Sequence, residues 1–175
     1  LGFDYMDTPN IDRLVREGVS LNNCFINASV CAPARASLLT GLYTPRHGVF
    51  TVGNSDRGKS AHRKLIPIKN TTVLKTELPT VAQVLKKAGY RTAVAGKGHV
   101  SQDPTSYGFD VNFGGLEWGH PKSYFSPYRN PKLKDGPKGE PLPARLAHEV
   151  CDWIPSPQPE IADGPFFLYL PFYSV

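Results

Sequence analysis

The residue types with the strongest chemistry gather in residues 31–41, which read CAPARASLLTG. The thiol of Cys31 is followed by Pro33, which fixes its own φ and suits the first turn of a helix. A helix that begins here would direct free N–H groups and the positive end of its dipole toward the space beside Cys31. Arg35, within the first turn, could stabilise a charged nucleophile. The alternative is a buried cysteine before an ordinary helix.

A second chemical segment is residues 89–99, GYRTAVAGKGH. Residues 90–95 are typical of a buried strand, and ligands usually bind where the strands of an α/β protein end. Strand alternation would place Lys97 and His99 on one side of an extended segment. Lys97 would supply a fixed positive charge, and His99 a hydrogen bond or a proton. Taken singly, each residue is more typical of an ordinary surface loop.

The elements that must position these residues alternate between helices and short apolar strands. Thr8 is a suitable N-cap and Gly18 a suitable stop for a first helix, in which Ile11, Leu14 and Val15 share a face. Further helices are expected from Pro33 to Gly41, with Leu38 and Leu39 inward, and at residues 78–88 and 142–154. Strands are expected at residues 19–26, 90–95 and 166–173, and irregular structure at 44–69 and 102–143. This order predicts an α/β layer fold with a largely parallel sheet and no linker between domains.

The composition is that of an ordinary soluble globular domain. The chain has 175 residues, of which 40% are hydrophobic and 20% charged, and no apolar run reaches the length of a membrane span. No signal peptide is recognisable from Leu1 onward. The net charge of +5 comes largely from two basic stretches, Arg57, Lys59, Arg63, Lys64 and Lys69, and Lys122, Arg129, Lys132, Lys134 and Lys138. They are interpreted as solvated loops or as an attraction for an anionic substrate; no nucleic-acid-binding module accompanies them.

The other cysteines carry no evident chemistry. Three cysteines cannot all pair within one chain. Cys24 lies in an apolar run and Cys151 on a helical face, so both are predicted to be small core residues. The glycosylation sequons at Asn27 and Asn70 occur often by chance and indicate little.

Residues 31–41 resemble the signature of the type I sulfatases, and residues 89–99 resemble that family's second signature, G-Y-x-T followed by G-K-x-H. Four further segments resemble family landmarks in the expected order, residues 8–14, 41–48, 107–110 and 165–170. The resemblance implies an alkaline phosphatase/sulfatase-like layered fold, a mostly parallel sheet with helices on both faces. Residues 1–175 would then be part of a single catalytic domain.

The resemblance also implies an activity, the hydrolysis of a sulfate ester of a carbohydrate or aryl alcohol. Cys31 would be oxidised to formylglycine, and the hydrate of that aldehyde would attack sulfur. Arg35, Lys97 and His99 would surround the nucleophile, with Lys97 and His99 binding the sulfate. Calcium, or magnesium, would bind the sulfate and the formylglycine oxygen at position 31. The expected partners are a sulfated small molecule or saccharide and a formylglycine-generating or anaerobic maturation enzyme; the expected location is periplasmic, secreted or lysosomal.

The chain departs from the family pattern in two respects. Gly98 stands where the family commonly has an aromatic residue, and it is expected to loosen the turn. The carboxylate pairs that hold the family's metal are missing, because Asp4 and Asp7 are not adjacent and no later pair is found. The sequence is therefore expected to represent the N-terminal third of a sulfatase, incomplete in its first strand and C-terminal portion, with weak metal binding and no activity of its own.

Other interpretations stay open. Residues 53–60 match the phosphate-loop pattern G-x-x-x-x-G-K-S, although Pro67 interrupts the helix that should follow. A phosphonate monoester or phosphodiester hydrolase of the same superfamily carries the same nucleophile motif, and a non-catalytic anion-binding protein is a third class. His148 and Glu149 begin like a zinc-protease helix, but Asp152 replaces the second histidine. Loop roles are expected for His47, His62 and His120, and a sugar could stack on Trp118, Tyr124 or Tyr128.

Overall fold

A parallel sheet forms the centre of the protein. The computed structural model describes residues 5, 7–156 and 164–173. Within them, the sheet has the order β2-β1-β3, with β1 (Arg91–Ala95) paired in parallel to β2 (Val111–Phe113) and to β3 (Phe166–Tyr169). The predicted α/β class and the parallel sheet are confirmed. Residues 19–26, expected to be a strand, form an irregular and exposed segment instead.

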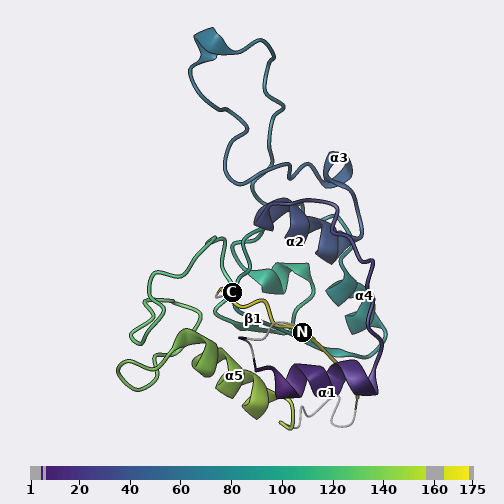
Figure 1. The fold of residues 1–175 in the computed structure, drawn as a ribbon, viewed down its shortest axis with the longest axis vertical. Helices are drawn as coiled ribbons and strands as arrows, with labels where there is room; N and C mark the ends of the chain where they lie inside the picture. The colour runs from purple at the N-terminus through teal and green to yellow at the C-terminus, as the bar shows by residue number, and fades with distance from the viewer. Residues whose placement is uncertain (1–4, 6, 157–163, 174–175) are drawn as a thin grey trace.

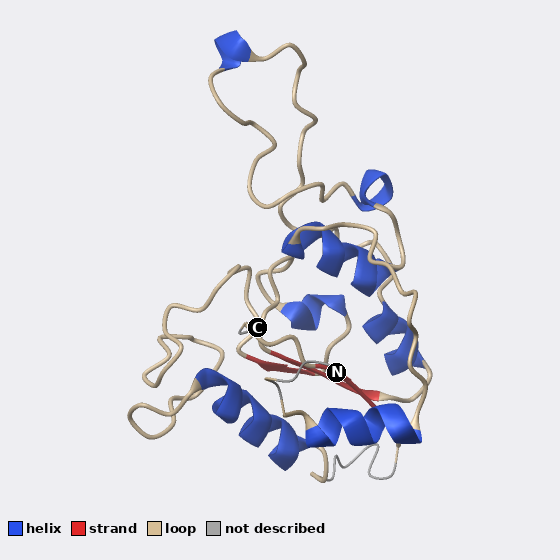
Figure 2. Ribbon diagram, in the orientation of Figure 1, coloured by secondary structure: helices blue, strands red, loops and turns tan. Residues whose placement is uncertain are grey.

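Helices lie on both faces of the sheet. Figures 1 and 2 show α2 (Cys31–Thr40), α4 (Val81–Lys87) and the short helix η2 (Pro104–Tyr107) on one face, and α5 (Leu142–Trp153) on the other. The remaining helices are α1 (Pro9–Glu17), α3 (Thr44–His47) and η1 (Ser60–His62). The layered arrangement expected from the resemblance is therefore present in the described part of the chain.

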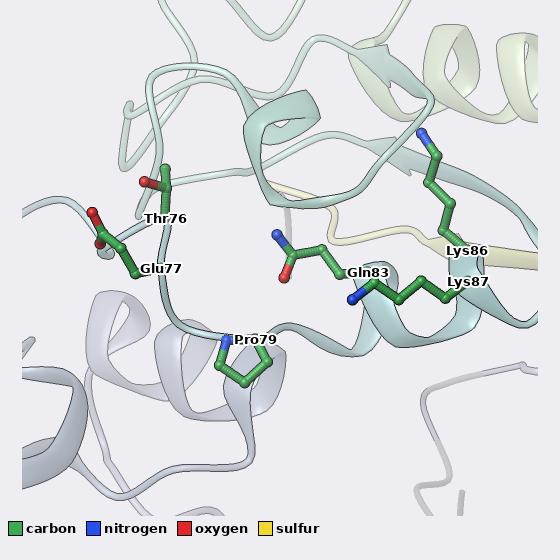
Figure 3. A pocket seen from close by; sticks show the side chains of 6 residues that line it. All are labelled: Thr76, Glu77, Pro79, Gln83, Lys86 and Lys87. Carbon is green, nitrogen blue, oxygen red and sulfur yellow. The ribbon is translucent and has the colours of Figure 1, made fainter.

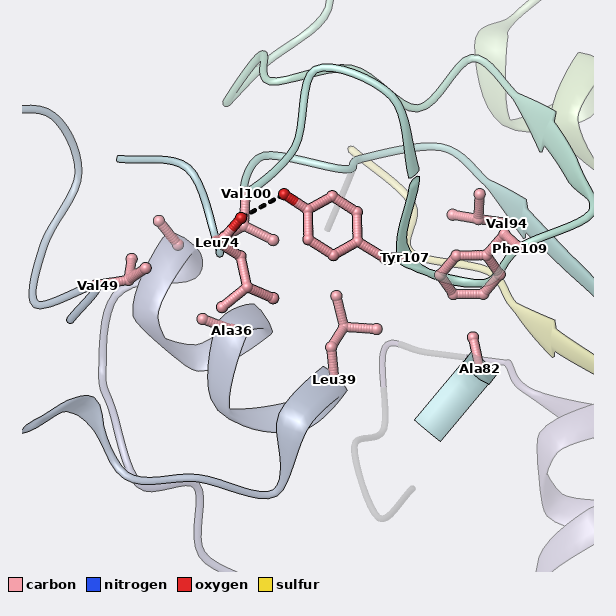
Figure 4. Close-up of a cluster of buried hydrophobic side chains, with 10 residues drawn as sticks. Ala36, Leu39, Val49, Leu74, Ala82, Val94, Val100, Tyr107 and Phe109 are labelled. Carbon is pink, nitrogen blue, oxygen red and sulfur yellow. Dashed lines mark hydrogen bonds between the residues drawn. The ribbon is translucent and has the colours of Figure 1, made fainter. Parts of the chain in front are cut away.

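Each face of the sheet carries its own hydrophobic cluster. On the α2 side, Val94 of β1 packs with residues of α2 and α4 (Figure 4). Phe167 and Tyr169 of β3 pack against this cluster. On the α5 side, Ala95 packs with one apolar stripe of α5, made of Leu142, Leu146 and Val150. The side chains of neighbouring strand residues thus point to opposite faces of the sheet, as the pleat of a strand requires.

Local sequence signals explain where the helices begin and end. Thr80 and Gln83 form a capping box, in which the Thr80 hydroxyl accepts from the Gln83 N–H and the Gln83 side chain accepts from the Thr80 N–H. This box makes α4 begin at Val81 rather than at residue 78. The predicted stop of α2 is confirmed, because Gly41 adopts a left-handed conformation with φ of 69°.

Several predicted core residues are exposed. Cys24 and Cys151 are both solvent-exposed, and so is Leu38, whereas its neighbour Leu39 is buried. The first helix forms as predicted, but none of its residues is buried. Thr8 donates from its hydroxyl to the Asp12 carboxylate instead of capping a backbone N–H. Helical spacing predicted where these helices lie but not which of their residues are buried.

A long loop leaves the body of the protein beside α3 (Figure 1). We call residues 51–69 the arm. Its base is closed where the Thr71 N–H donates to the Gly48 carbonyl at 2.9 Å. The Asn70 side chain completes the closure, because its Oδ1 accepts from the N–H groups of Phe50 and Thr51 and its Nδ2 donates to the carbonyls of Thr51 and Gly53. The arm is thus closed at its base by a backbone hydrogen bond together with the side chain of Asn70.

Candidate functional site

Cys31 is the first residue of α2, in a half-buried position. The preceding residue, Val30, has extended dihedrals and offers no side-chain cap, so the first N–H groups of the helix are free of a capping side chain. The buried residues Ala32 and Ala36 hold the helix against the core. The predicted presentation of Cys31 at a helix N-terminus is therefore found, with the helix beginning at Cys31 itself rather than at Pro33.

Arg35 ties this helix to the ends of two strands. Its Nη1 donates to the main-chain oxygen of Lys97 at 3.0 Å and to the hydroxyl of Tyr169 at 2.8 Å. Its Nε is buried and has no hydrogen-bond partner among the described residues. The guanidinium is thus held by two hydrogen bonds from Nη1, which keep its positive charge beside the N-terminal half of α2.

An open hollow of about 240 Å³ lies beside these residues. Cys31 and Arg35 line it together with Tyr169 and Pro171, which come from the end of β3 and the residues after it. The remaining lining residues are Ile26, Ala34 and Leu38. The hollow therefore brings the predicted nucleophile and its arginine to the carboxyl end of the sheet, where parallel α/β proteins bind ligands.

The segment after β1 is a tight turn rather than the extended segment that alternation predicted. Gly96 has φ of 109° and His99 has φ of 68°, a left-handed value that is uncommon for a residue other than glycine. The Lys97 N–H donates to the Pro171 carbonyl at 2.8 Å, and the His99 N–H donates to the Leu116 carbonyl at 2.7 Å. Two neighbouring segments thus hold Lys97 and His99 in place.

Gly98 tightens this turn instead of loosening it. A Cβ at Gly98 would lie 2.6 Å from the Leu116 oxygen, closer than real side chains approach, and 3.1 Å from the Leu116 nitrogen. The glycine therefore allows the backbone at Leu116 to lie directly against the turn. The same segment places Gly119 against the imidazole of His99, since a Cβ at Gly119 would lie 3.1 Å from Nε2.

His99 is a neutral base in a cationic surrounding. Burial lowers its pKa to about 4, with further lowering by the charges of Lys97, Arg35 and His120. Its Nδ1 is buried, with no hydrogen-bond partner in the described ranges. Burial also raises the pKa of Tyr169, while Arg35 acts in the opposite direction. Arg35, Lys97 and His99, picked out by the sequence, therefore influence one another electrostatically.

The described residues do not supply a metal site. No group of three or more histidine, cysteine, aspartate or glutamate side chains is gathered within residues 5, 7–156 and 164–173. The charges that act on His99 are cationic, whereas calcium and magnesium require several oxygen ligands. The donors present here do not fit a divalent cation. Asp4, which was considered for this role, lies outside the described residues.

The competing motifs find no support in the geometry. Residues 53–60 lie in the arm, and the segment that follows them is η1, a single 3-10 turn instead of the helix that a phosphate loop requires. His148 is exposed and bonds to Glu140 at 3.2 Å, and Glu149 pairs with Arg145 at 3.1 Å. His148 is thus an exposed residue of α5, whereas Glu149 is half-buried there.

The loop role expected for His47 was wrong, and the ring of Tyr128 is not exposed as stacking on a sugar would require. His47 belongs to α3 and is 1% exposed; its Nε2 lies 2.9 Å from the Ser37 hydroxyl, and its Nδ1 accepts from the Val49 N–H. Burial lowers its pKa. Tyr128 is also 1% exposed and donates to Glu140, so it is unavailable for stacking on a sugar. One face of Trp118 is covered by the ammonium of Lys122, 4.4 Å from the ring centroid.

A second surface hollow lies away from these residues. It is lined by Gln83, Lys86 and Lys87 of α4 and by the segment before that helix, with Thr76, Glu77 and Pro79 (Figure 3). Lys86 is engaged in an ion pair with Asp110. None of the residues singled out by the sequence lines this hollow.

Sequence reasoning missed the residues that organise the site from other segments. Tyr169 and Pro171 were placed in a strand but not in the site, and Leu116 and Gly119 were placed in an irregular region. A usable signal was the alternation of Phe167 and Tyr169, which puts both side chains on one face. No local pattern indicated the contact between Gly119 and His99.

Comparisons with known proteins agree with this geometry. The profile of the family described as Sulfatase matches residues 1–175. The chain is 38% identical to arylsulfatase H of Canis lupus familiaris over 123 residues, which is 65% of this chain and 21% of that protein. It is 35% identical to human (Homo sapiens) N-acetylgalactosamine-6-sulfatase over 130 residues, 71% of this chain and 23% of that protein. The chain thus spans about a fifth of the length of these relatives.

A solved structure shows the same fold. It is a protein in complex with its substrate D-glucosamine-2-N,6-O-disulfate, with a TM-score of 0.69 and 23% sequence identity, and the match covers 97% of this chain and 30% of the other. At this level of identity the likeness concerns the fold alone. The expected alkaline phosphatase/sulfatase-like fold is confirmed, and the family match over residues 1–175 shows that the chain belongs to the sulfatase family.

Proposed function

We propose that the protein carrying this chain hydrolyses sulfate esters, with Cys31 as the precursor of its nucleophile. Residues 1–175 would form part of a single catalytic domain. The observation that supports this most is the pair of hydrogen bonds from Arg35, which join the helix of Cys31 to Lys97 and Tyr169. The first of these bonds ends on the main-chain oxygen of Lys97, so it holds Arg35 and the helix of Cys31 against the segment that carries Lys97 and His99.

Each residue has a role that its surroundings allow. After conversion of Cys31 to formylglycine, one hydroxyl of its hydrated aldehyde would attack the ester sulfur as the alcohol leaves. The second hydroxyl would then lose its proton and expel sulfate, which restores the aldehyde. Arg35, held by its two hydrogen bonds, keeps a positive charge beside that group. Lys97 contributes a second charge for the sulfate oxygens. His99, neutral above about pH 4, can hold or pass a proton at its unpaired Nδ1.

Sulfatases generally use a divalent metal together with formylglycine. Calcium, or magnesium, is the expected ion, but the described residues do not group the carboxylates that it needs. No step is therefore assigned to it, and its ligands would have to include groups other than those described.

The substrate class proposed is a sulfated saccharide, with a sulfated aryl alcohol as the simpler alternative. Two observations on relatives support a saccharide: one curated relative is named for N-acetylgalactosamine-6-sulfate, and the compared structure holds a sulfated glucosamine. A formylglycine-generating or anaerobic maturation enzyme would be the partner that modifies Cys31. A periplasmic, secreted or lysosomal location is proposed with it. In the described ranges, no helix has both the length and the apolar character needed to cross a bilayer.

The experiment compares two ester classes with one nucleophile variant. The protein as its gene encodes it, produced in a host that makes formylglycine, is assayed with p-nitrophenyl sulfate and with an aryl phosphonate monoester. The proposal predicts sulfate hydrolysis that is lost in Cys31→Ala and retained in Cys151→Ala, whose thiol is exposed on α5. Faster hydrolysis of the phosphonate would favour a phosphonate monoester hydrolase, and equal activity of Cys31→Ala would refute the assignment of the nucleophile.

A further inference from the structure

The arm, residues 51–69, concentrates positive charge far beyond the needs of one sulfate group. It carries five basic side chains, Arg57, Lys59, Arg63, Lys64 and Lys69, and one carboxylate, Asp56. It projects from the body of the protein (Figure 1) and has few buried contacts of its own. Like charges in one short loop repel one another, so this composition weakens the loop unless an anion compensates it.

The arginines of the arm bond within the arm itself, unlike its lysines. Arg57 donates to the carbonyls of Asn54 and Asp56, and Arg63 donates to those of Arg57 and Gly58. The arginines therefore shape the loop from within. Arg63 also pairs with Asp56 at 3.4 Å, so it uses the one carboxylate of the arm.

The lysines remain available. Lys59, Lys64 and Lys69 are exposed, and none of them pairs with a carboxylate in the described part of the chain. Between Lys64 and Lys69 the side chains of Leu65 and Ile66 are 85% and 97% exposed. The arm thus offers exposed ammonium groups next to apolar surface, a combination that suits an anionic chain whose rings have apolar faces.

The base of the arm is fixed close to the candidate site. Val49 and Leu74, on either side of the base, are buried in the cluster that packs under α2 with Ala32 and Ala36 (Figure 4). The Leu74 N–H donates to the Val100 carbonyl at 2.8 Å, and Val100 directly follows His99. The segment that follows the arm is therefore hydrogen-bonded to the residue next to His99, which connects the base of the arm to the candidate site.

We infer that the arm is a binding surface for a polyanionic saccharide, which contacts Lys59, Lys64 and Lys69 through anionic groups other than the sulfate that is cleaved. This inference rests on the proposed function and narrows its substrate class to chains with several sulfate groups. A monosulfated aryl ester would not reach the arm. The arm would therefore lower KM for oligosaccharides and leave the hydrolysis of small esters unchanged.

The test separates binding from hydrolysis. Binding of heparin oligosaccharides of defined length is measured with Cys31→Ala protein, which cannot turn them over, by fluorescence titration at several salt concentrations. Into this background are placed Lys59→Ala/Lys64→Ala and the matched control Lys134→Ala/Lys138→Ala, which removes the same charge from an exposed loop elsewhere (Figure 1). Hyaluronan oligosaccharides of the same length, which carry no sulfate, serve as the second probe.

The arm variant is expected to bind heparin about tenfold more weakly, with a smaller dependence on salt, because each exposed ion pair contributes modestly and is screened. The control is expected to bind within about twofold of the parent. Equal binding by the arm variant and its parent would overturn the inference, and so would equal losses in both double variants. A changed sedimentation coefficient with unchanged heparin binding would assign the arm to contact with a second copy instead.

The same variants distinguish this inference from the proposed function. With Cys31 intact, the arm variant should hydrolyse p-nitrophenyl sulfate like the wild type. If p-nitrophenyl sulfate is hydrolysed but the arm variant binds heparin as its parent does, the inference about the arm is overturned. The proposed function is then retained. Specific heparin binding through the arm, with no hydrolysis of any sulfate ester by the wild type, would refute the proposed function and leave the arm as a saccharide-binding surface.

Discussion

Arg35 donates a hydrogen bond from Nη1 to the main-chain oxygen of Lys97, 3.0 Å away and 62 positions later in the chain. This bond joins the second turn of α2 to the turn that follows β1. Because its acceptor is a backbone atom, the position of Arg35 does not depend on where the Lys97 ammonium points. The two signature segments are thus held together by a contact that leaves both Lys97 and Cys31 free for a ligand.

Replacing Arg35 tests this linkage. Arg35→Met keeps the stem but removes the guanidinium, and is expected to lower the free energy of unfolding by about 1–3 kcal/mol. In the enzyme assay it should lower kcat/KM for an aryl sulfate by roughly 10²–10³, the usual cost of losing a charge-stabilising donor. Tyr169→Phe is the control, because it removes one acceptor of Nη1 and keeps the ring stacked on Phe109. Similar kcat/KM values for Arg35→Met and Tyr169→Phe would contradict a charge role for Arg35.

The lowered pKa of His99 predicts a stability that falls in acid. The folded pKa is about 4, below the ordinary value of 6.5, so the unfolded chain binds more protons between these values. The contribution is fully present above pH 6.5 and is lost as the pH falls from 6.5 toward 4. It is expected to reach roughly 3 kcal/mol. His47, whose pKa is lowered by burial, acts in the same direction.

Chemical unfolding of wild type and His99→Asn at several pH values between 4 and 7 measures this effect. Asparagine tolerates the left-handed φ at position 99, so the variant isolates the loss of the imidazole. The slope of unfolding free energy against pH should be smaller in the variant. If both proteins lose stability in parallel, His99 is not buried in its neutral form.

Gly98 is predicted to be intolerant of any side chain. Gly98→Ala would place a Cβ 2.6 Å from the Leu116 oxygen, and the expected loss of unfolding free energy is about 2 kcal/mol, together with displacement of the turn. Gly53→Ala is the comparison, since its Cβ would meet no atom within 4 Å and only the positive φ opposes it, at about 1 kcal/mol. Thermal unfolding measures both. A neutral Gly98→Ala would mean that the Leu116 segment yields easily.

Asn70 is predicted to hold the arm in shape without supporting the core. Asn70→Ala removes the hydrogen bonds to Phe50, Thr51 and Gly53, so cleavage within residues 51–69 by limited proteolysis should become markedly faster. The midpoint of thermal unfolding should change little. Asn27→Ala removes a sequon whose side chain makes one exposed bond to Leu42, and it serves as the control. Unchanged cleavage of Asn70→Ala would show that the arm is shaped without this side chain.

Local sequence patterns predicted most helices and strands, because helix ends and buried strands have recognisable residue types. Gly41 and Gly18 marked helix ends, and β1, buried along its whole length, stood out as an apolar run. Residues 19–26 have the composition of a strand but lie exposed, since strand formation depends on a neighbour with which to pair. Composition alone could not reveal that condition.

The same distinction applies to the candidate site, where residues in short motifs could be predicted and their distant contacts could not. Cys31, Arg35, Lys97 and His99 were recognisable because each lies within a short motif. The hydrogen-bond partners of Arg35 lie 62 and 134 positions later in the chain, and His99 contacts the Leu116–Gly119 segment. No local sequence rule could therefore predict these contacts. Gly98 was misjudged for this reason: its effect depends on a backbone approach from Leu116, not on the volume that an aromatic residue would have filled.

The chemical state of residue 31 tests the account most directly. Mass spectrometry of the peptide that contains Cys31, from protein made in a host that produces formylglycine, should show a mass lower than that of the cysteine peptide by about 18 Da, one oxygen gained for one sulfur and two hydrogens lost. The converted fraction should also account for the hydrolysis of p-nitrophenyl sulfate. A peptide that retains cysteine in protein that hydrolyses the sulfate ester would contradict the role proposed for Cys31.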